Sequence, residues 1–328
     1  MTEPQTVSAA PEPQSFAARA RLALVRSERP VAWVTVAIPA LGACSALGLL
    51  LSGIAPPTLL EIGVTLALYL ITGLGITVGF HRLFTHHAFA APPAIRLVLG
   101  ILGSMAAQGP LFFWAAAHRR HHTGSDRADD PHSPHRKGEA RLSRMRGLLH
   151  AHVGWMLVPR EATGWGQIPD LLRDRTAFFV NRWYLAWVGL GLALPAAISG
   201  IWHGTAVAAG PGLLWGGLVR IFLVQHATWS VNSLGHVAGR KSFTTRDESR
   251  NNALVALITL GEGWHNNHHA FPASARHGLG RWEIDPSWLA IRLLSRFGLT
   301  TDIRLPRPEQ MEHRRHGRSS EVKEEMQR

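Results

Sequence analysis

One stretch decides the fold: residues 68–86, which read LYLITGLGITVGFHRLFTH. A long apolar run leads here directly into two histidines, His81 and His86. About 20 apolar residues are needed for a helix to cross a bilayer. The chain therefore places imidazole side chains at the end of a membrane span, and other parts of the sequence repeat this combination.

Two further histidine clusters read His118-Arg-Arg-His121-His122 and His265-Asn-Asn-His268-His269, and between them lies Asn232-Ser-Leu-Gly-His236. On an α-helix, residues i, i+3 and i+4 share one face, so each triplet can direct three ring nitrogens at a small volume. Neutral imidazole is a ligand for iron, copper, zinc and nickel. One triplet could be an accident of a polar surface, but the combination predicts a polynuclear metal site.

The clustered imidazoles are too many for a single ion, so the sequence predicts two. They are His81, His86, His118, His121, His122, His236, His265, His268 and His269. Residues five apart diverge by about 140° on an ideal α-helix, so we expect the first pair to sit where the span ends or to serve different ions. Asn232, four residues before His236, can bind an ion directly or through a water molecule. Iron best fits imidazole ligation and chemistry at a membrane, and the lack of a carboxylate within the triplets distinguishes the site from carboxylate-rich helical bundles.

Charge and cysteine content exclude several other classes of protein. The net charge is +12 with histidines neutral, but the basic residues flank apolar spans, which favours anionic lipid over nucleic acid. The single cysteine, Cys44, lies in an apolar run, which excludes a disulfide framework and a thiolate metal site.

Four stretches are long enough to cross a bilayer, and short connectors pair them into two helical hairpins. Their approximate bounds are 31–52, 58–80, 183–202 and 205–228. Arginines concentrate before the first span and in the long central loop, so the positive-inside rule places that loop and both termini in the cytoplasm. The sequence predicts an all-α, multi-pass integral membrane protein, with the cell membrane as its expected location.

A fifth apolar run, residues 97–117, is interpreted as a re-entrant or interfacial segment because Gly109-Pro110 interrupts it. As a full span it would place His118 and His81 on opposite sides of the membrane. We expect a membrane domain over residues 31–304 with a cytosolic helical cap from 81–182 and 229–304, a disordered cytosolic tail over 1–30 and a polar tail over 305–328. Short helices are expected at 253–262 and 286–297, the second on the membrane surface or capping the cytosolic domain.

Several charged residues and isolated histidines have more than one interpretation. We expect Arg220, inside the fourth span, to reach the cytosolic end or a polar partner such as Glu262. Asp129 and Asp130 either orient histidine N–H groups or cap a loop. Most of the unclustered histidines are expected to be solvated or to lie beside the ligands; they are His132, His135, His150, His152, His203, His226 and His277.

The motifs resemble those of the membrane fatty acid desaturase family, in particular Δ9 acyl desaturases similar to stearoyl-CoA desaturase. The matching stretches run over about 77–122 and 220–272, with His152-Val-Gly-Trp155 between them. The resemblance implies a mushroom-shaped helical fold with a di-iron centre under a cytosolic cap. It also implies O₂-dependent insertion of a cis double bond, at Δ9, into a long-chain acyl group for lipid synthesis.

The resemblance also implies roles for individual residues. The nine clustered histidines become iron ligands and Asn232 a water-mediated one. Gln108, Trp114, Thr228 and Trp229 would line an acyl tunnel, or else pack at the membrane interface. Arg160 stands where acyl-CoA enzymes contact CoA phosphates. Polar CoA contacts are replaced here by Gly109, Ala116 and Ala117, so acyl-CoA, acyl-lipid and a carrier protein all stay open as acyl carriers.

Two other functions compete with the desaturase. A di-iron membrane hydroxylase of alkyl or lipid substrates would bear similar histidine clusters. A metal transporter would need ionisable groups along its spans, and here these are almost confined to Glu61 and Arg220. The sequence contains no Gly-rich flavin or nicotinamide motif, so we expect a separate electron donor: a ferredoxin, a rubredoxin-like protein or a cytochrome, with its reductase.

Overall fold

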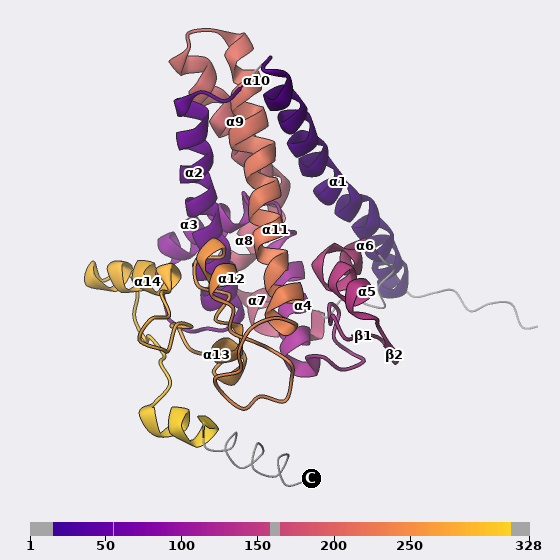
Figure 1. Cartoon of the computed structure of the whole chain (residues 1–328), viewed down its shortest axis with the longest axis vertical. Coiled ribbons are helices and arrows are strands. Elements are labelled where there is room, and N and C mark those ends of the chain that lie inside the picture. The colour runs from indigo at the N-terminus through magenta and orange to yellow at the C-terminus, as the bar shows by residue number, and fades with distance from the viewer. Residues whose placement is uncertain (1–15, 55, 158–164, 316–328) are drawn as a thin grey trace, which may run out of the picture.

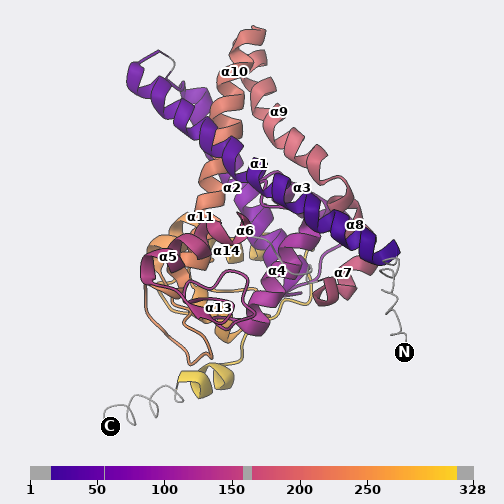
Figure 2. The ribbon, with the colours of Figure 1, turned by 90° about the vertical axis from the view of Figure 1, so that its right-hand side faces the viewer.

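The computed structural model describes residues 16–54, 56–157 and 165–315, with side chains from residue 32 onward. Long helices extend toward one end of the molecule, and short helices gather at the other end (Figure 1). We call this second part the globular end; it comprises α3–α8, α12–α14 and the β1-β2 hairpin. A view turned by 90° again places α4 and α13 among the elements of the globular end (Figure 2).

Four helical stretches are long and apolar enough to cross a membrane: Ala32–Ser52, Leu59–Thr85, Tyr184–Trp202 and Ala206–His236. They confirm the four spans expected from the sequence, but the second and fourth continue beyond their expected ends. His81 and His236 therefore lie on the helices that form the spans. The first helix, α1 (Phe16–Ser52), also begins upstream of the expected start of its span.

The remaining bounds follow in chain order. The second span is formed by α2 (Leu59–Leu74) and the π-helix η1 (Gly75–Thr85), and the globular end then includes α3 (Pro93–Ser104), α4 (Leu111–Gly124), β1 (Arg136–Lys137), β2 (Ala140–Arg141), α5 (Arg144–Leu149), η2 (His150–Gly154), α6 (Trp155–Leu157), η3 (Trp165–Gln167), α7 (Pro169–Arg173) and α8 (Arg175–Arg182). After α9 (Tyr184–Trp202) come η4 (Ala206–Ala208), α10 (Ala209–Gly212), η5 (Leu213–Val219), α11 (Arg220–Ser233), η6 (Leu234–His236), α12 (Ala253–Ile258), α13 (His265–Ala270) and α14 (Pro286–Arg296). A further short helix covers 308–315.

The π-helix η1 corrects the expectation that the first two histidines diverge. Its backbone bonds close every five residues rather than every four, as where the His86 amide donates to the His81 carbonyl at 3.1 Å. Residues five apart therefore lie on the same face, and both imidazoles point into one site. The 140° divergence holds for an ideal α-helix, whereas this segment is a π-helix.

The fifth apolar run forms two helices, α3 and α4, separated by residues 105–110. Ala107 and Gly109 adopt positive φ angles of 53° and 98° in this break, so the chain turns where the sequence places Gly109-Pro110. With 12 residues, α3 is too short to cross a bilayer. It packs closely on η1, because a Cβ on Gly75 would lie 2.2 Å from the Gly103 amide nitrogen.

The helix expected over 253–262 is shorter than predicted. It ends at Ile258 as α12, because Leu260 and Gly261 have positive φ angles of 55° and 111°. A Cβ on Gly261 would lie 2.4 Å from Asp285 Oδ1, so only glycine fits this turn. The expected helix at 286–297 is present as α14, and the Asp285 carboxylate caps it by accepting from the Trp288 amide at 2.9 Å.

Arg220 meets polar partners, as expected, but they are backbone carbonyls and not the carboxylate of Glu262. The guanidinium is fully buried and donates to three backbone carbonyls, those of Met105 at 2.6 Å, Gly191 at 2.7 Å and Gly216 at 3.2 Å. Glu262 is instead bound by Arg82 and His81. Carbonyls freed at the α3–α4 break and at a glycine of α9 thus satisfy a charge that a membrane span would otherwise exclude.

We expect Gly75→Ala to destabilise the protein by about 1–3 kcal/mol or more, because its Cβ would meet the backbone of α3 and force the two helices apart. Gly63→Ala is the matched control, since a Cβ there meets nothing within 4 Å, and alanine favours a helix by up to about 1 kcal/mol. Thermal unfolding of both variants in detergent measures this. Equal melting temperatures would contradict the close packing of η1 on α3.

Candidate metal centre

The nine clustered histidines form two groups. The first contains His81, His86, His118, His122 and His268, and the second contains His121, His236, His265 and His269; within each group the ligand atoms all lie within 4.8 Å of one another. Helices α4 and α13 each contribute to both groups. In each triplet the i and i+4 residues share one group, and the remaining histidine joins the other. The two helices thus lie between two neighbouring sites.

The Nε2 atoms face one another at the spacing expected around an ion. In the first group a chain of contacts runs from His86 to His118 (2.9 Å), His122 (3.0 Å), His268 (2.8 Å) and His81 (3.1 Å). In the second group the pairs His121–His269 and His236–His265 are 3.2 and 3.0 Å apart. Imidazole nitrogens lie about 2.0–2.1 Å from a bound zinc ion, and two such ligands at right angles would be about 3.0 Å apart.

Four carboxylates hold the opposite ring nitrogens, Nδ1. Glu262 lies 2.7 Å from His81, Asp130 3.0 Å from His121, Asp126 2.9 Å from His236 and Asp247 2.8 Å from His269. Carboxylates of this kind fix the tautomer and orientation of metal-binding imidazoles. Of the two aspartates considered from the sequence, Asp130 therefore orients a histidine. Asp126, Asp247 and Glu262 were missed in this role, because none has a fixed spacing from its partner.

These contacts determine where the protons are. An ionised carboxylate only accepts hydrogen bonds, so Nδ1 of its histidine carries the proton, and when the ring is neutral, as metal binding requires, Nε2 presents a lone pair. His121 and His269 are both held in this way, yet their Nε2 atoms are only 3.2 Å apart. Two buried lone pairs directed at each other repel, and a cation between them removes the repulsion. The donor set therefore fits a bound metal ion.

The environment also favours the neutral form of six of the nine imidazoles. Burial, followed by the charge of neighbouring imidazoles, lowers the pKa of each of the following residues well below its usual value: His86, His118, His122, His265, His268 and His269. The neutral ring is the form that binds metal. Burial alone would raise the pKa of Glu262, but its contacts with His81, His277 and Arg82 lower it well below the usual range. This carboxylate is therefore ionised.

Two of the unclustered histidines lie beside the groups and are buried. His277 Nδ1 is 3.1 Å from Glu262, and His132 Nδ1 is 3.7 Å from Asp130. Burial and the neighbouring His121 lower the pKa of His132 to about 3. Arg82, which is also fully buried, donates to both Glu262 and Asp285. Glu262, which holds His81, is thus itself held by Arg82.

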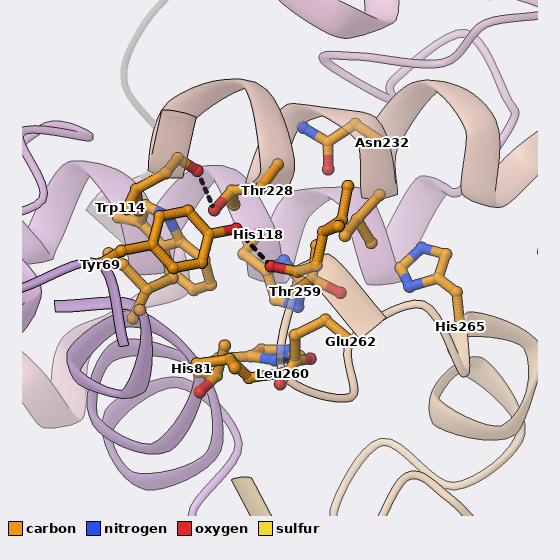
Figure 3. Close-up of a pocket in the computed structure, with 17 residues that line it drawn as sticks. Tyr69, His81, Trp114, His118, Thr228, Asn232, Thr259, Leu260, Glu262 and His265 are labelled. Atoms are coloured by element: carbon orange, nitrogen blue, oxygen red, sulfur yellow. Dashed lines mark hydrogen bonds and ion pairs between the residues drawn. The ribbon is translucent and has the colours of Figure 1, made fainter. Parts of the chain in front are cut away.

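An apolar cavity lies against the first group. Its wall includes Trp114, Thr228 and Asn232, together with His81 and His265 (Figure 3). Gln108 stands behind this wall and donates to Thr228 Oγ1 at 2.8 Å. Trp229 lies elsewhere: its ring packs on His226 and His152, with centroids 5.1 and 6.0 Å apart. Its neighbours on α11 face the cavity instead. Arg160 lies outside the described residues.

Comparisons with known proteins agree with these motifs. A family model described as fatty acid desaturase matches residues 56–287. The chain is 43% identical over 277 residues to a hex-5-enoyl-[acyl-carrier protein] acetylenase of Moorena producens, covering 84% of this chain and 86% of the relative. It is 41% identical to an sn-1 stearoyl-lipid 9-desaturase of Synechocystis (75% and 72% covered) and 38% identical to a palmitoyl-monogalactosyldiacylglycerol delta-7 desaturase of Arabidopsis thaliana (75% and 62% covered).

Asp130→Asn should lower metal affinity about 10- to 100-fold, because the amide lacks the charge that orients His121 and makes it basic. Asp129→Asn is the matched control: its side chain is exposed, and its backbone carbonyl, which accepts from Arg120, is retained. Titration of the apoprotein with Fe²⁺ measures both. Equal affinities in the two variants would contradict the role assigned to Asp130.

The two groups should bind one ion each. His86→Ala removes a ligand from the first group and His236→Ala from the second, so each variant should retain about half of the metal of the wild type. Elemental analysis of purified protein measures the stoichiometry. A single ion in the wild type, or complete loss of metal from both variants while they stay folded, would contradict two separate groups.

Proposed function

The chain belongs to the membrane fatty acid desaturase family, and on that premise we propose that it is an O₂-dependent, di-iron acyl desaturase. Desaturases are oxidoreductases, and the names of its relatives refer to acyl groups on lipid, CoA and carrier protein. Its proposed reaction is the insertion of a cis double bond, at Δ9, into a long-chain acyl substrate. Three of the similar proteins are named 9-desaturases, which supports this position.

The observation that carries the proposal is the pair of histidine groups, five and four imidazoles, with lone pairs converging inside each group. We assign one iron ion to each group, with Asn232 completing the second group through water. Iron with O₂ supplies the oxidising power to remove hydrogen from an unactivated C–H bond, which side chains alone cannot do. The ligands proposed are the nine residues predicted from the sequence.

The chain's own residues bind and orient the substrate. The cavity adjoins His81 and His265, and its apolar wall would exclude water from the reacting carbons. Trp114 and Thr228 contact the acyl chain in this proposal, and Gln108 fixes the Thr228 hydroxyl. Arg160 is proposed to meet the charged part of the acyl carrier. Trp229, which packs away from the cavity, supports α11 rather than touching the acyl chain.

The proposed topology has two helical hairpins, α1 with α2 and α9 with α11, beneath a cytosolic cap formed by residues 81–182 and 229–304. His81 lies in the last turn of the second span and His236 ends the fourth, so a single metal centre requires both ends on the same side of the membrane. The arginines of the loops favour the cytoplasmic side and cytoplasmic termini. Electrons would come from a separate ferredoxin, rubredoxin-like protein or cytochrome with its reductase.

The test must also distinguish two other products. The acetylenase relative is named for a triple bond made from hex-5-enoyl carrier protein, so a terminal alkyne is a specific alternative. A hydroxylase with the same ligands would leave an alcohol. Both retain the metal centre and change only the outcome of the C–H reaction.

Expression in a desaturase-deficient host, with fatty acids analysed by gas chromatography and mass spectrometry, tests the proposal. We expect a new cis-monoene that is absent with His268→Ala, since this residue belongs to the first group. His203→Ala, which follows the end of α9, serves as the control and should retain the product. An alcohol or an alkyne as the main product, or an undiminished monoene with His268→Ala, would contradict the proposed function.

A further inference from the structure

The cavity has a second boundary, away from the histidines, where two helices meet. The Tyr69 hydroxyl donates to the Ile258 carbonyl at 2.5 Å, and both residues line the cavity. Tyr69 belongs to α2 and Ile258 is the last residue of α12. Figure 3 shows the Tyr69 ring in the cavity wall, with its hydroxyl directed at the backbone next to Thr259. We call this contact the α2–α12 seam.

The outer side of the seam is apolar and exposed. On α2, Leu66 and Leu70 are 60% and 49% exposed, and on α12, Leu254 and Leu257 are 69% and 71% exposed. Exposed large apolar side chains on both helices are typical of a surface that contacts lipid or protein. Because α2 is part of a helix long and apolar enough to cross a membrane, the surface continues the lipid-facing side of that helix.

The inner side of the seam leads to the metal centre along one helix. Tyr69, Gly73, Thr77 and His81 line the cavity at four-residue intervals, a path of roughly 18 Å at 1.5 Å per residue. The facing wall on α11 is mainly apolar, with Val224, Ala227 and Val231. The ionised Glu262 lines the cavity beside His81, so an acyl chain that passed the seam could reach the imidazoles along a mainly apolar wall.

The seam is also built to open at little cost. A single neutral hydrogen bond contributes little net stability. Helix α12 has six residues and is followed by the positive-φ pair Leu260 and Gly261, so a short element bounded by a turn forms one side. At Gly73 a Cβ would lie 3.0 Å from Leu260 Cδ1, so the turn after α12 closes directly on α2.

We propose that the acyl chain of a membrane lipid enters the cavity sideways from the bilayer, through the α2–α12 seam, and that the Tyr69–Ile258 hydrogen bond is the latch. The inference rests on the proposed desaturase function and adds an entrance and a gating residue to it. The competing role for Tyr69 is a fixed floor that limits the length of a chain arriving from the cytosolic side. The two roles differ in the effect of removing the hydroxyl alone: its removal should open a latch but should leave a fixed floor unchanged.

The test uses the full chain in lipid nanodiscs containing a phosphatidylcholine with a diazirine near the end of one acyl chain. After illumination, mass spectrometry locates adducts on the outer leucines of the seam and on the buried cavity residues Ile76 and Val224. We expect adducts on both. Tyr69→Phe should raise cavity labelling about 2- to 10-fold, the factor that corresponds to one lost hydrogen bond.

Tyr184→Phe is the matched control, because Tyr69 and Tyr184 are the two tyrosines of the chain and the Tyr184 hydroxyl accepts from the Gly109 amide. It should label like the wild type. Adducts confined to the outer surface in both the wild type and Tyr69→Phe would overturn the proposal. The proposal would also be overturned if Tyr69→Ala gave longer products while Tyr69→Phe left cavity labelling unchanged, because that outcome identifies Tyr69 as a fixed floor.

Labelling needs neither iron nor an electron donor, so it separates the entrance from the chemistry. The same diazirine chain supplied as a CoA thioester provides the comparison, and we expect its cavity labelling to be unaffected by Tyr69→Phe. Equal gains for both probes would overturn entry from the membrane. Cavity labelling by the lipid without an unsaturated product from any acyl carrier would instead count against the proposed function and leave the entrance standing.

Discussion

The structure depends on one electrostatic constraint: buried imidazoles whose Nε2 atoms converge. His121 and His269 show it most clearly, because carboxylates hold both Nδ1 protons while the two Nε2 atoms face each other at 3.2 Å. Such a contact is unfavourable in a low-dielectric interior unless a cation occupies the space between the rings. The carboxylates, the buried Arg82 and the close packing of η1 all serve to hold this arrangement.

The candidate membrane spans contribute residues to the candidate metal centre and do not merely anchor it. The second span ends in the π-helix that brings His81 and His86 to one face, and the fourth ends at His236. Because α4 and α13 each supply ligands to both groups, the groups cannot shift independently. The cavity follows the second span toward the first group, so the helix that crosses the membrane also forms the path of the proposed substrate.

Much of the site could be predicted from the sequence, for identifiable reasons. The triplets obey the i, i+3, i+4 rule, and the four spans follow from apolar length. Three features could not be predicted. The π-helix at 75–85 has no propensity signal, and its only trace was the five-residue histidine spacing. Asp126 and Asp247 lie at no fixed distance from their partners along the chain. Arg220 is satisfied by backbone carbonyls that become available only when α3, α9 and α11 pack together.

X-ray absorption at the iron edge of the purified, reconstituted protein tests the central claim most directly. The account predicts two iron ions per chain, each surrounded by nitrogen scatterers with the outer-shell pattern of imidazole rings. Asp130→Asn would weaken this pattern at one iron while leaving the other intact. A shell dominated by carboxylate oxygen or sulfur, or fully active protein with no bound iron, would contradict the account.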